Sequence, residues 1–184
     1  MSQYLPYYWI RHRAIPVELC KLVLAEREQL TSADAGLGIN NEVTNNNMRR
    51  TNIAWAPANH WLEGVMLNNA RYANRETGWN MDIDTCEQVQ LARYDTGHFY
   101  DWHVDTFFLA DAPTSRKITV VALLNDASEF EGGDFELQNC DSSGLRLSQG
   151  SIVAFPSYMS HRATAVTSGT RYSAALWIHG PAFR

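Results

Sequence analysis

The chain has 184 residues, of which 45% are hydrophobic, 11% aromatic and 19% charged, and its formal net charge is −5. This length fits one domain, predicted to span residues 1–184, and the apolar content is sufficient for a packed core. The acidic balance argues against a nucleic-acid backbone or an anionic membrane as the main partner.

Cysteine usage and hydropathy indicate in which cell compartment the protein is expected. The three cysteines are an odd number at no ligand-like spacing, which indicates neither a disulfide framework nor a zinc site. No stretch approaches 18 apolar residues, and no basic segment followed by a long apolar run opens the chain. We therefore expect a soluble, cytoplasmic protein with no membrane partner.

The first half of the chain is predicted to be mainly helical. Residues 4–15 are aromatic and β-branched and predict an edge strand. Pro16 suits the first position of a helix, and residues 57–59 introduce a second one. Residues 31–50 are rich in Gly, Asn, Ser and Thr and predict a long polar loop. We place this helical support at about residues 16–78.

From about residue 80 the apolar pattern changes from helical to alternating. Short strand-like runs are separated by turn residues, among them the Gly-Gly pair at 132–133, which predicts a tight turn. The predicted strands are 89–94, 99–105, 117–124, 135–137, 152–155 and 170–179. The predicted fold class is mainly β with flanking helices: an antiparallel jelly-roll core at about residues 86–180, supported by N-terminal helices.

The pair His103-x-Asp105 is the first chemical signal. Residues two apart in an extended strand point to the same face, so this imidazole and carboxylate can bind one ion. They are two of the three ligands in the two-histidine, one-carboxylate triad that holds non-haem iron(II). On its own the pair is weak evidence. His161 is the candidate third ligand, whereas His98 lies on the opposite strand face by alternation.

Arg171 follows His161 by ten residues on a predicted strand. By alternation it shares one face with Ser173, Ala175, Trp177 and His179. An inward guanidinium needs an anionic partner, because an unpaired buried charge is too costly to persist. A bound carboxylate would serve, since arginine binds carboxylates in a bidentate manner.

One ordered series of motifs carries a family resemblance. The series is Tyr94, His103-x-Asp105, Arg116-x-x-Thr119, Gly132-Gly133, His161, Arg171-x-Ser173 and Trp177. It resembles the iron(II)- and 2-oxoglutarate-dependent dioxygenases over roughly residues 86–180. Within them the chain is most similar to the prolyl-4-hydroxylase-like branch and its small microbial PKHD-type members. Their ending, Phe-Pro-Ser…Ser-His-Arg-x-Thr-x-Val-Thr-x-Gly-x-Arg, is matched at residues 155–171.

The resemblance implies a double-stranded β-helix of the cupin type and two sets of site residues. The implied Fe(II) ligands are His103, Asp105 and His161, and the implied 2-oxoglutarate contacts are Arg171, Tyr94, Ser173, Thr119 and Leu123. Arg171 would pair with the distal carboxylate of 2-oxoglutarate. The cofactors implied are Fe(II), 2-oxoglutarate and O₂, with ascorbate as an accessory reductant. No side-chain general base is implied beyond the metal ligands.

The implied activity is hydroxylation of a C–H bond, in a peptidyl residue such as proline, with release of succinate and CO₂. One alternative keeps this chemistry and changes the substrate to a free amino acid or another small metabolite. A second alternative is a non-catalytic jelly-roll module that binds a metal or ligand, although Arg171 beside the triad argues against it. A nucleic-acid substrate is disfavoured, because the related dealkylases have a second arginine where this chain has Trp177.

Overall fold

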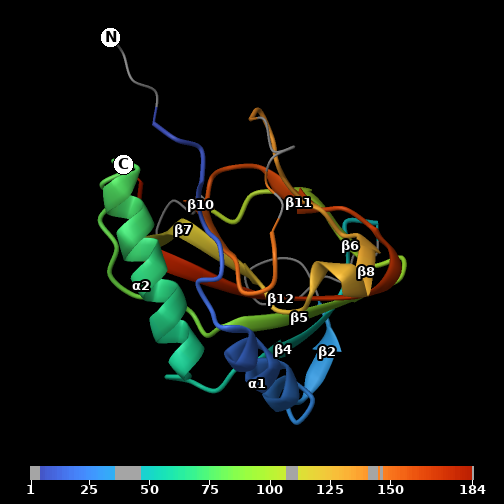
Figure 1. Cartoon of the computed structure of the whole chain (residues 1–184). Coiled ribbons are helices and arrows are strands. Elements are labelled where there is room, and N and C mark those ends of the chain that lie inside the picture. Colours follow the sequence, from blue (N-terminus) through green and yellow to red (C-terminus); the bar gives the residue numbers. More distant parts are fainter. Residues whose placement is uncertain (1–4, 36–46, 107–111, 141–144, 146, 184) are drawn as a thin grey trace.

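The structure is a computed structural model that describes residues 5–35, 47–106, 112–140, 145 and 147–183 (Figure 1). Within these ranges two α-helices occur, α1 (Val17–Arg27) and α2 (Trp61–Glu76), and both were predicted. Pro16 precedes α1, and the His60 ring caps α2 by accepting a hydrogen bond from the Leu62 backbone N–H at 3.3 Å.

Strands in the described part of the chain form two antiparallel sheets. The larger sheet has the order β1-β10-β7-β12-β5-β4-β2, with β8 paired to the start of β12. Its strands are β1 (Trp9–Arg11), β2 (Ser32–Asp34), β4 (Asn52–Trp55), β5 (Gln90–Asp95), β7 (Thr114–Leu123), β8 (Phe130–Gly132), β10 (Ile152–Pro156) and β12 (Val166–Pro181). The smaller sheet has the order β3-β6-β11-β9, formed by β3 (Arg49–Arg50), β6 (Phe99–His103), β11 (His161–Ala163) and β9 (Phe135–Leu137). A short 3₁₀ helix, η1 (Ala127–Glu129), leads into β8.

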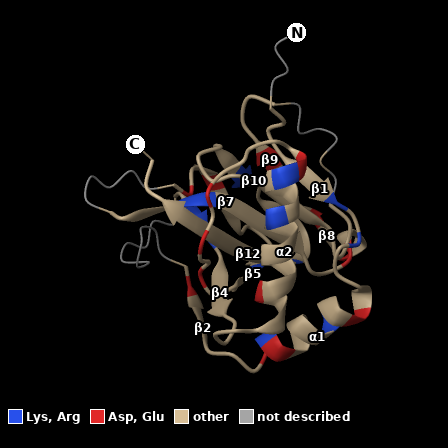
Figure 2. Cartoon of the chain, turned by 90° about the vertical axis from the view of Figure 1, so that its left-hand side faces the viewer, with Lys and Arg blue, Asp and Glu red and all other residues tan. Residues whose placement is uncertain are grey.

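The larger sheet separates the helical layer from the smaller sheet. In Figure 1, α2 lies on the left of the central strands, and β6 and β11 lie on the right; Figure 2 shows α2 crossing the sheet. The apolar side of α2, including Leu62 and Met66, is fully buried against one face of β7 and β12. Because side chains alternate along a strand, the other face of β7 and β12 is free to build a site.

Several predicted boundaries need correction. The predicted loop 31–50 carries strands at both ends, β2 and β3, because each pairs with a distant strand; residues 36–46 lie outside the described residues. The predicted strand 99–105 ends at His103, because the Asp105 N–H donates to the Ser157 carbonyl at 2.9 Å instead of continuing the ladder. Strand β11 was not predicted, because three residues are too few to show an alternating pattern.

Candidate active site

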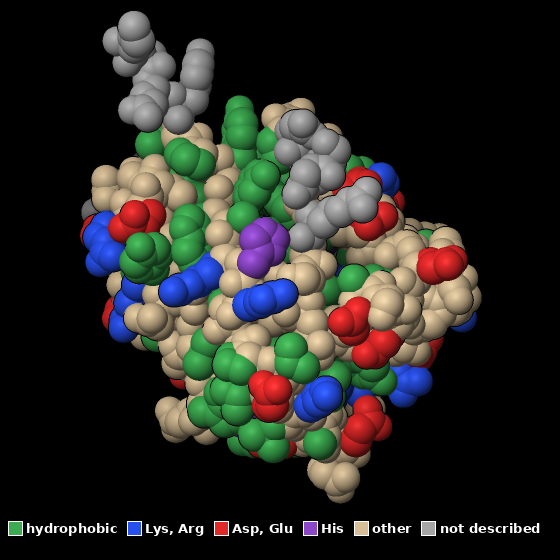
Figure 3. All heavy atoms as spheres, in the orientation of Figure 1, with side chains coloured by type: hydrophobic (Ala, Val, Ile, Leu, Met, Phe, Trp, Pro, Cys, Tyr) green, Lys and Arg blue, Asp and Glu red, His purple; other side chains and the backbone are tan. Residues whose placement is uncertain are grey.

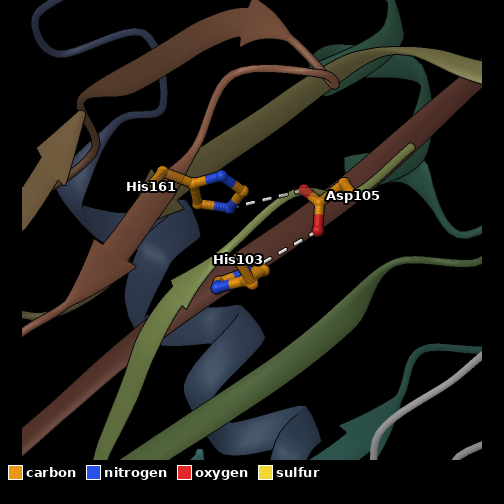
Figure 4. Close-up of side chains that lie close together, drawn as sticks. All are labelled: His103, Asp105 and His161. Carbon is orange, nitrogen blue, oxygen red and sulfur yellow. Dashed lines mark ion pairs between the residues drawn. The ribbon is translucent and has the colours of Figure 1, made fainter. Parts of the chain in front are cut away.

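Three potential metal ligands converge between the two sheets. His103 ends β6, Asp105 follows two residues later, and His161 begins β11 directly opposite His103 in the β6–β11 pairing. His103 Nε2 lies 3.6 Å from Asp105 Oδ1, and His161 Nε2 lies 3.4 Å from Asp105 Oδ2 (Figure 4). The ligand atoms all lie within 4.8 Å of one another, so they could hold one ion.

Backbone carbonyls orient both imidazole rings. His103 Nδ1 lies 2.7 Å from the Asp101 carbonyl oxygen, and His161 Nδ1 lies 3.0 Å from that of Met159. A carbonyl only accepts, so each Nδ1 carries a proton, and Nε2 is the ring nitrogen that faces Asp105 and can bind a metal. Two nitrogen ligands and one carboxylate are the donor set that suits non-haem iron(II). The residues present therefore fit this metal.

The electrostatics of the cluster favour the protonation states that a metal requires. Burial, with His161 close by, lowers the pKa of His103 to about 3. Burial alone would raise the pKa of Asp105, but the groups around the carboxylate together outweigh burial and lower that pKa. A neutral imidazole and an ionised carboxylate are the forms that bind metal ions.

Hydroxyl groups hold the Asp105 carboxylate in place. Thr119 Oγ1 donates to Asp105 Oδ2 at 2.8 Å, and Thr119 Oγ1 lies 3.0 Å from Ser157 Oγ. The Ser157 carbonyl in turn accepts the Asp105 N–H. Both Thr119 and Ser157 are buried, so water does not compete for these bonds. Such partners orient a metal ligand and tune its basicity.

An aromatic stack supports His103 from the other side. The Tyr100 ring lies parallel to the His103 ring, with centroids 3.4 Å apart and planes at 9°. The Arg49 guanidinium lies 4.5 Å from the Tyr100 ring centroid and donates to Gln90 Oε1 at 2.7 Å. Burial raises the pKa of Tyr100 to about 12, so its hydroxyl is neutral at physiological pH.

The triad opens into a cavity with an empty volume of about 500 Å³. One wall is the predicted inward face of β12, and four of its five residues line the cavity: Arg171, Ser173, Ala175 and Trp177. Tyr94, directly opposite Arg171 in the β5–β12 pairing, lines it too. The strand alternation read from the sequence is thereby confirmed for this wall. His179, which follows a register shift after Ile178, pairs with Glu87 instead.

Arg171 is a buried cation, with 3% of its surface exposed. Its Nη1 donates to Ser173 Oγ at 3.1 Å, and its guanidinium lies 5.4 Å from the Tyr94 ring centroid. No described carboxylate forms an ion pair with it, and Asp134 acts on it only electrostatically. Burial lowers its pKa, although Tyr94 and Asp134 oppose this. A buried guanidinium without a described ion-pair partner favours binding of an anion at the end of the cavity that Arg171 lines.

Two of the predicted co-substrate contacts, Thr119 and Leu123, differ from the others in their hydrogen bonding or in the cavity that they line. Thr119 lines the cavity, but its hydroxyl donates to Asp105 and so is not free for another acceptor. Leu123 lines a neighbouring cavity, with an empty volume of about 820 Å³, which Arg171 also lines. Leu123 pairs with Ser173 in the β7–β12 ladder, whereas Thr119 pairs with Trp177.

Sequence reasoning missed other residues of the cavity. Gln90 and Ala92 line it from β5, and the alternation that includes Tyr94 was a usable signal for them. Arg49 had no such signal, because its place depends on the pairing of β3 with β6. Tyr100 lines the cavity as well, where its ring stacks on that of His103.

Of the helices in the described residues, none is long and apolar enough to cross a bilayer. On the face shown in Figure 3, acidic and basic side chains are interspersed with hydrophobic ones.

Comparison with known proteins agrees with this geometry. The sequence profile of the 2OG-Fe(II) oxygenase superfamily matches residues 89–179, the segment that holds the three ligand candidates and Arg171. A PKHD-type hydroxylase of Idiomarina loihiensis is 34% identical over 94 residues, which are 50% of this chain and 41% of that relative. The chain spans about two-fifths of the length of the curated relatives that it matches.

Solved structures share the fold at low sequence identity. A viral collagen prolyl hydroxylase from Paramecium Bursaria Chlorella virus-1, in complex with 2OG, has a TM-score of 0.70 at 19% identity, with 95% of this chain and 97% of that chain covered. A Trichoplax adhaerens prolyl hydroxylase, in complex with a hypoxia inducible factor peptide fragment, has a TM-score of 0.66 at 20% identity, covering 94% and 83%. The predicted jelly roll is confirmed. The chain belongs to the 2OG-Fe(II) oxygenase superfamily.

Proposed function

We propose that this chain is an Fe(II)- and 2-oxoglutarate-dependent dioxygenase that hydroxylates a C–H bond in a peptidyl residue such as proline, releasing succinate and CO₂. One observation carries the proposal: a two-histidine, one-carboxylate cluster lines the same cavity as a buried arginine that forms no ion pair with any described residue. Bound Fe(II) and 2-oxoglutarate supply the oxidising chemistry with O₂.

In this proposal His103, Asp105 and His161 bind the metal through the two Nε2 atoms and a carboxylate oxygen. The Nδ1–H groups donate to the Asp101 and Met159 carbonyls, so the rings cannot turn away when the metal arrives. Thr119 restrains the carboxylate in the same way. The ligand atoms are therefore positioned before the metal binds, which reduces the cost of ordering them.

Arg171 and Ser173 form the anion-binding end of the cavity. The guanidinium binds the distal carboxylate of 2-oxoglutarate, and the Ser173 and Tyr94 hydroxyls contribute further hydrogen bonds. Val121, Ala175 and Trp177 line the cavity between this end and the triad. Their apolar surfaces exclude water, which strengthens the charge pairing at Arg171.

The substrate class is proposed from the relatives. The curated relatives are named PKHD-type hydroxylases, and both solved neighbours described above are prolyl hydroxylases, one of them holding a peptide. A peptide or protein partner with an exposed proline is therefore the first class to test.

The test is a turnover assay with the purified protein, Fe(II), 2-oxoglutarate and O₂ on a panel of proline-containing peptides. We expect one peptide class to gain the mass of one oxygen atom, with an equal amount of succinate, and His161→Ala to abolish both. If the peptides stay unchanged and free amino acids gain an oxygen atom, the substrate class is free amino acids and not peptides. Binding of 2-oxoglutarate without any succinate would overturn the enzymatic proposal in favour of a binding module.

A further inference from the structure

The turn between β8 and β9 reaches the anion-binding end of the site. The sequence predicts no more than a tight turn at Gly132-Gly133, and both residues have positive φ, +70° and +64°. The Gly133 N–H donates to the Ala165 carbonyl at 3.1 Å, which brings the turn directly against the start of β12. Arg171 lies on the same strand, five residues further along.

A side chain at either glycine would collide with residues 165–171, but with different atoms in each case. A Cβ on Gly132 would collide with the Ala165 carbonyl oxygen, so Gly132 is needed for the backbone path. A Cβ on Gly133 would lie 2.8 Å from Arg171 Cδ and 3.0 Å from Val166 Cγ2. These are side-chain atoms, and both distances are shorter than ordinary van der Waals contact. A side chain at position 133 would therefore press directly on the Arg171 side chain.

The neighbours of Gly133 are buried side chains. Val166 is 1% exposed and Arg171 3% exposed, so neither side chain can swing into solvent. The guanidinium of Arg171 is held by its bond to Ser173 Oγ. A methyl group at position 133 would push the Cδ of Arg171 and so shift the guanidinium at the end of the same short stem.

We propose that Gly133 is a positioning residue for Arg171: the absent side chain at this turn sets where the guanidinium lies, and hence how tightly the cavity binds a dicarboxylate. The inference rests on the proposed function, because it takes 2-oxoglutarate as the anion. It assigns the Gly-Gly turn a part in co-substrate selection beyond chain reversal. A change at Gly133 weakens recognition of the distal carboxylate and leaves the metal ligands untouched.

The test compares two 2-oxo acids on the Mn(II)-loaded protein by titration calorimetry. 2-Oxoglutarate carries the distal carboxylate, and 2-oxobutanoate lacks it. In Gly133→Ala we expect the Kd for 2-oxoglutarate to rise about tenfold or more. The Kd for 2-oxobutanoate and for Mn(II) should each stay within about twofold. Equal weakening of both acids, or no weakening, would overturn the proposal.

Gly97→Ala is the matched control. Gly97 also has positive φ, +82°, but a Cβ there meets nothing within 4 Å. It therefore carries the backbone strain of an alanine at positive φ without any contact to Arg171. We expect its Kd for 2-oxoglutarate to equal that of the wild type, and a rise matching Gly133→Ala would assign the effect to general strain and overturn the proposal.

A double-mutant cycle with Arg171→Ala tests whether Gly133 acts through the arginine. In the Arg171→Ala background, Gly133→Ala should change the Kd for 2-oxoglutarate by less than about twofold. Gly133→Ala alone could fail to fold. In that case, a double variant that folds again with Arg171→Ala supports the contact between position 133 and Arg171. A double variant that also fails to fold overturns the proposal. A wild type that binds both acids equally would instead refute the proposed role of Arg171, a result distinct from failure at Gly133.

Discussion

Thr119 on β7 donates its hydroxyl proton to Asp105 Oδ2 at 2.8 Å, and both side chains are buried. The bond crosses from the larger sheet to the segment that follows β6, so it ties the two sheets together at the metal site. Thr119, which also lines the cavity, therefore contacts one of the three candidate metal ligands directly.

Thr119→Val removes this bond at nearly constant volume. We expect the affinity for Fe(II), or for Mn(II) as its stand-in, to fall about 10- to 100-fold, because the carboxylate loses its orienting partner. Metal titration followed by calorimetry measures the change. Thr119→Ser keeps the hydroxyl and should retain affinity near the wild-type value; equal affinities in all three proteins would show that the bond has no part in metal binding.

Arg171→Ala separates anion binding from metal binding. The buried guanidinium supplies charge-assisted hydrogen bonds, so we expect the Kd for 2-oxoglutarate to rise about 100-fold or more while the metal affinity stays unchanged. Arg171→Lys keeps the charge but loses the planar guanidinium, so its Kd for 2-oxoglutarate should lie between those of the wild type and Arg171→Ala. Parallel loss of metal and 2-oxoglutarate in Arg171→Ala would contradict the separation.

The stability of the metal-free protein should depend on pH through His103. Its pKa is about 3 in the folded chain, against 6.5 for an ordinary histidine. Between these values the unfolded chain binds the additional proton, so the free energy of unfolding falls as the pH drops below 6.5, by up to about 1.4 kcal/mol per pH unit. Urea unfolding of the metal-free protein from about pH 7 down to about pH 5 measures this slope.

His103→Gln is the matched control for that slope. The amide does not titrate, so the variant loses the His103 contribution, and its stability should depend less steeply on pH than that of the wild type. Parallel pH profiles for the two proteins would show that another group causes the slope.

Two of the cysteines should be unreactive as thiols. Burial, with Glu18 nearby, raises the pKa of Cys20 to about 11, and burial, with Glu63 nearby, raises that of Cys86 to about 11. The thiolate is the reactive form, so at neutral pH we expect Cys86 to react with iodoacetamide at least about 100-fold more slowly than free cysteine. Cys20, with 0% of its surface exposed, should stay unlabelled until the chain unfolds.

Peptide mapping by mass spectrometry after timed labelling checks both cysteines. In urea both should label rapidly, which controls for reagent and detection. Fast labelling of Cys86 in the folded protein would show that its surroundings do not suppress the thiolate.

Local pattern in the sequence determined the elements and the directions of their side chains. The helical period predicted α1 and α2, and strand alternation predicted that Arg171, Ser173 and Trp177 face the same way, as they do in the cavity. The spacing of His103 and Asp105 indicated one pair of ligands on a single strand face. Such features depend on neighbours along the chain, and so they can be read without knowledge of the fold.

Only the tertiary structure decided which of these side chains meet. Thr119 reaches Asp105, Leu123 lies beside the second cavity, and the Gly133 turn lies against Arg171, none of which the alternation of a single strand contains. Strand β11 likewise exists through its pairing with β6 and β9. Periodicity gives the direction in which a side chain points, whereas distances depend on the register and packing of strands far apart in the sequence.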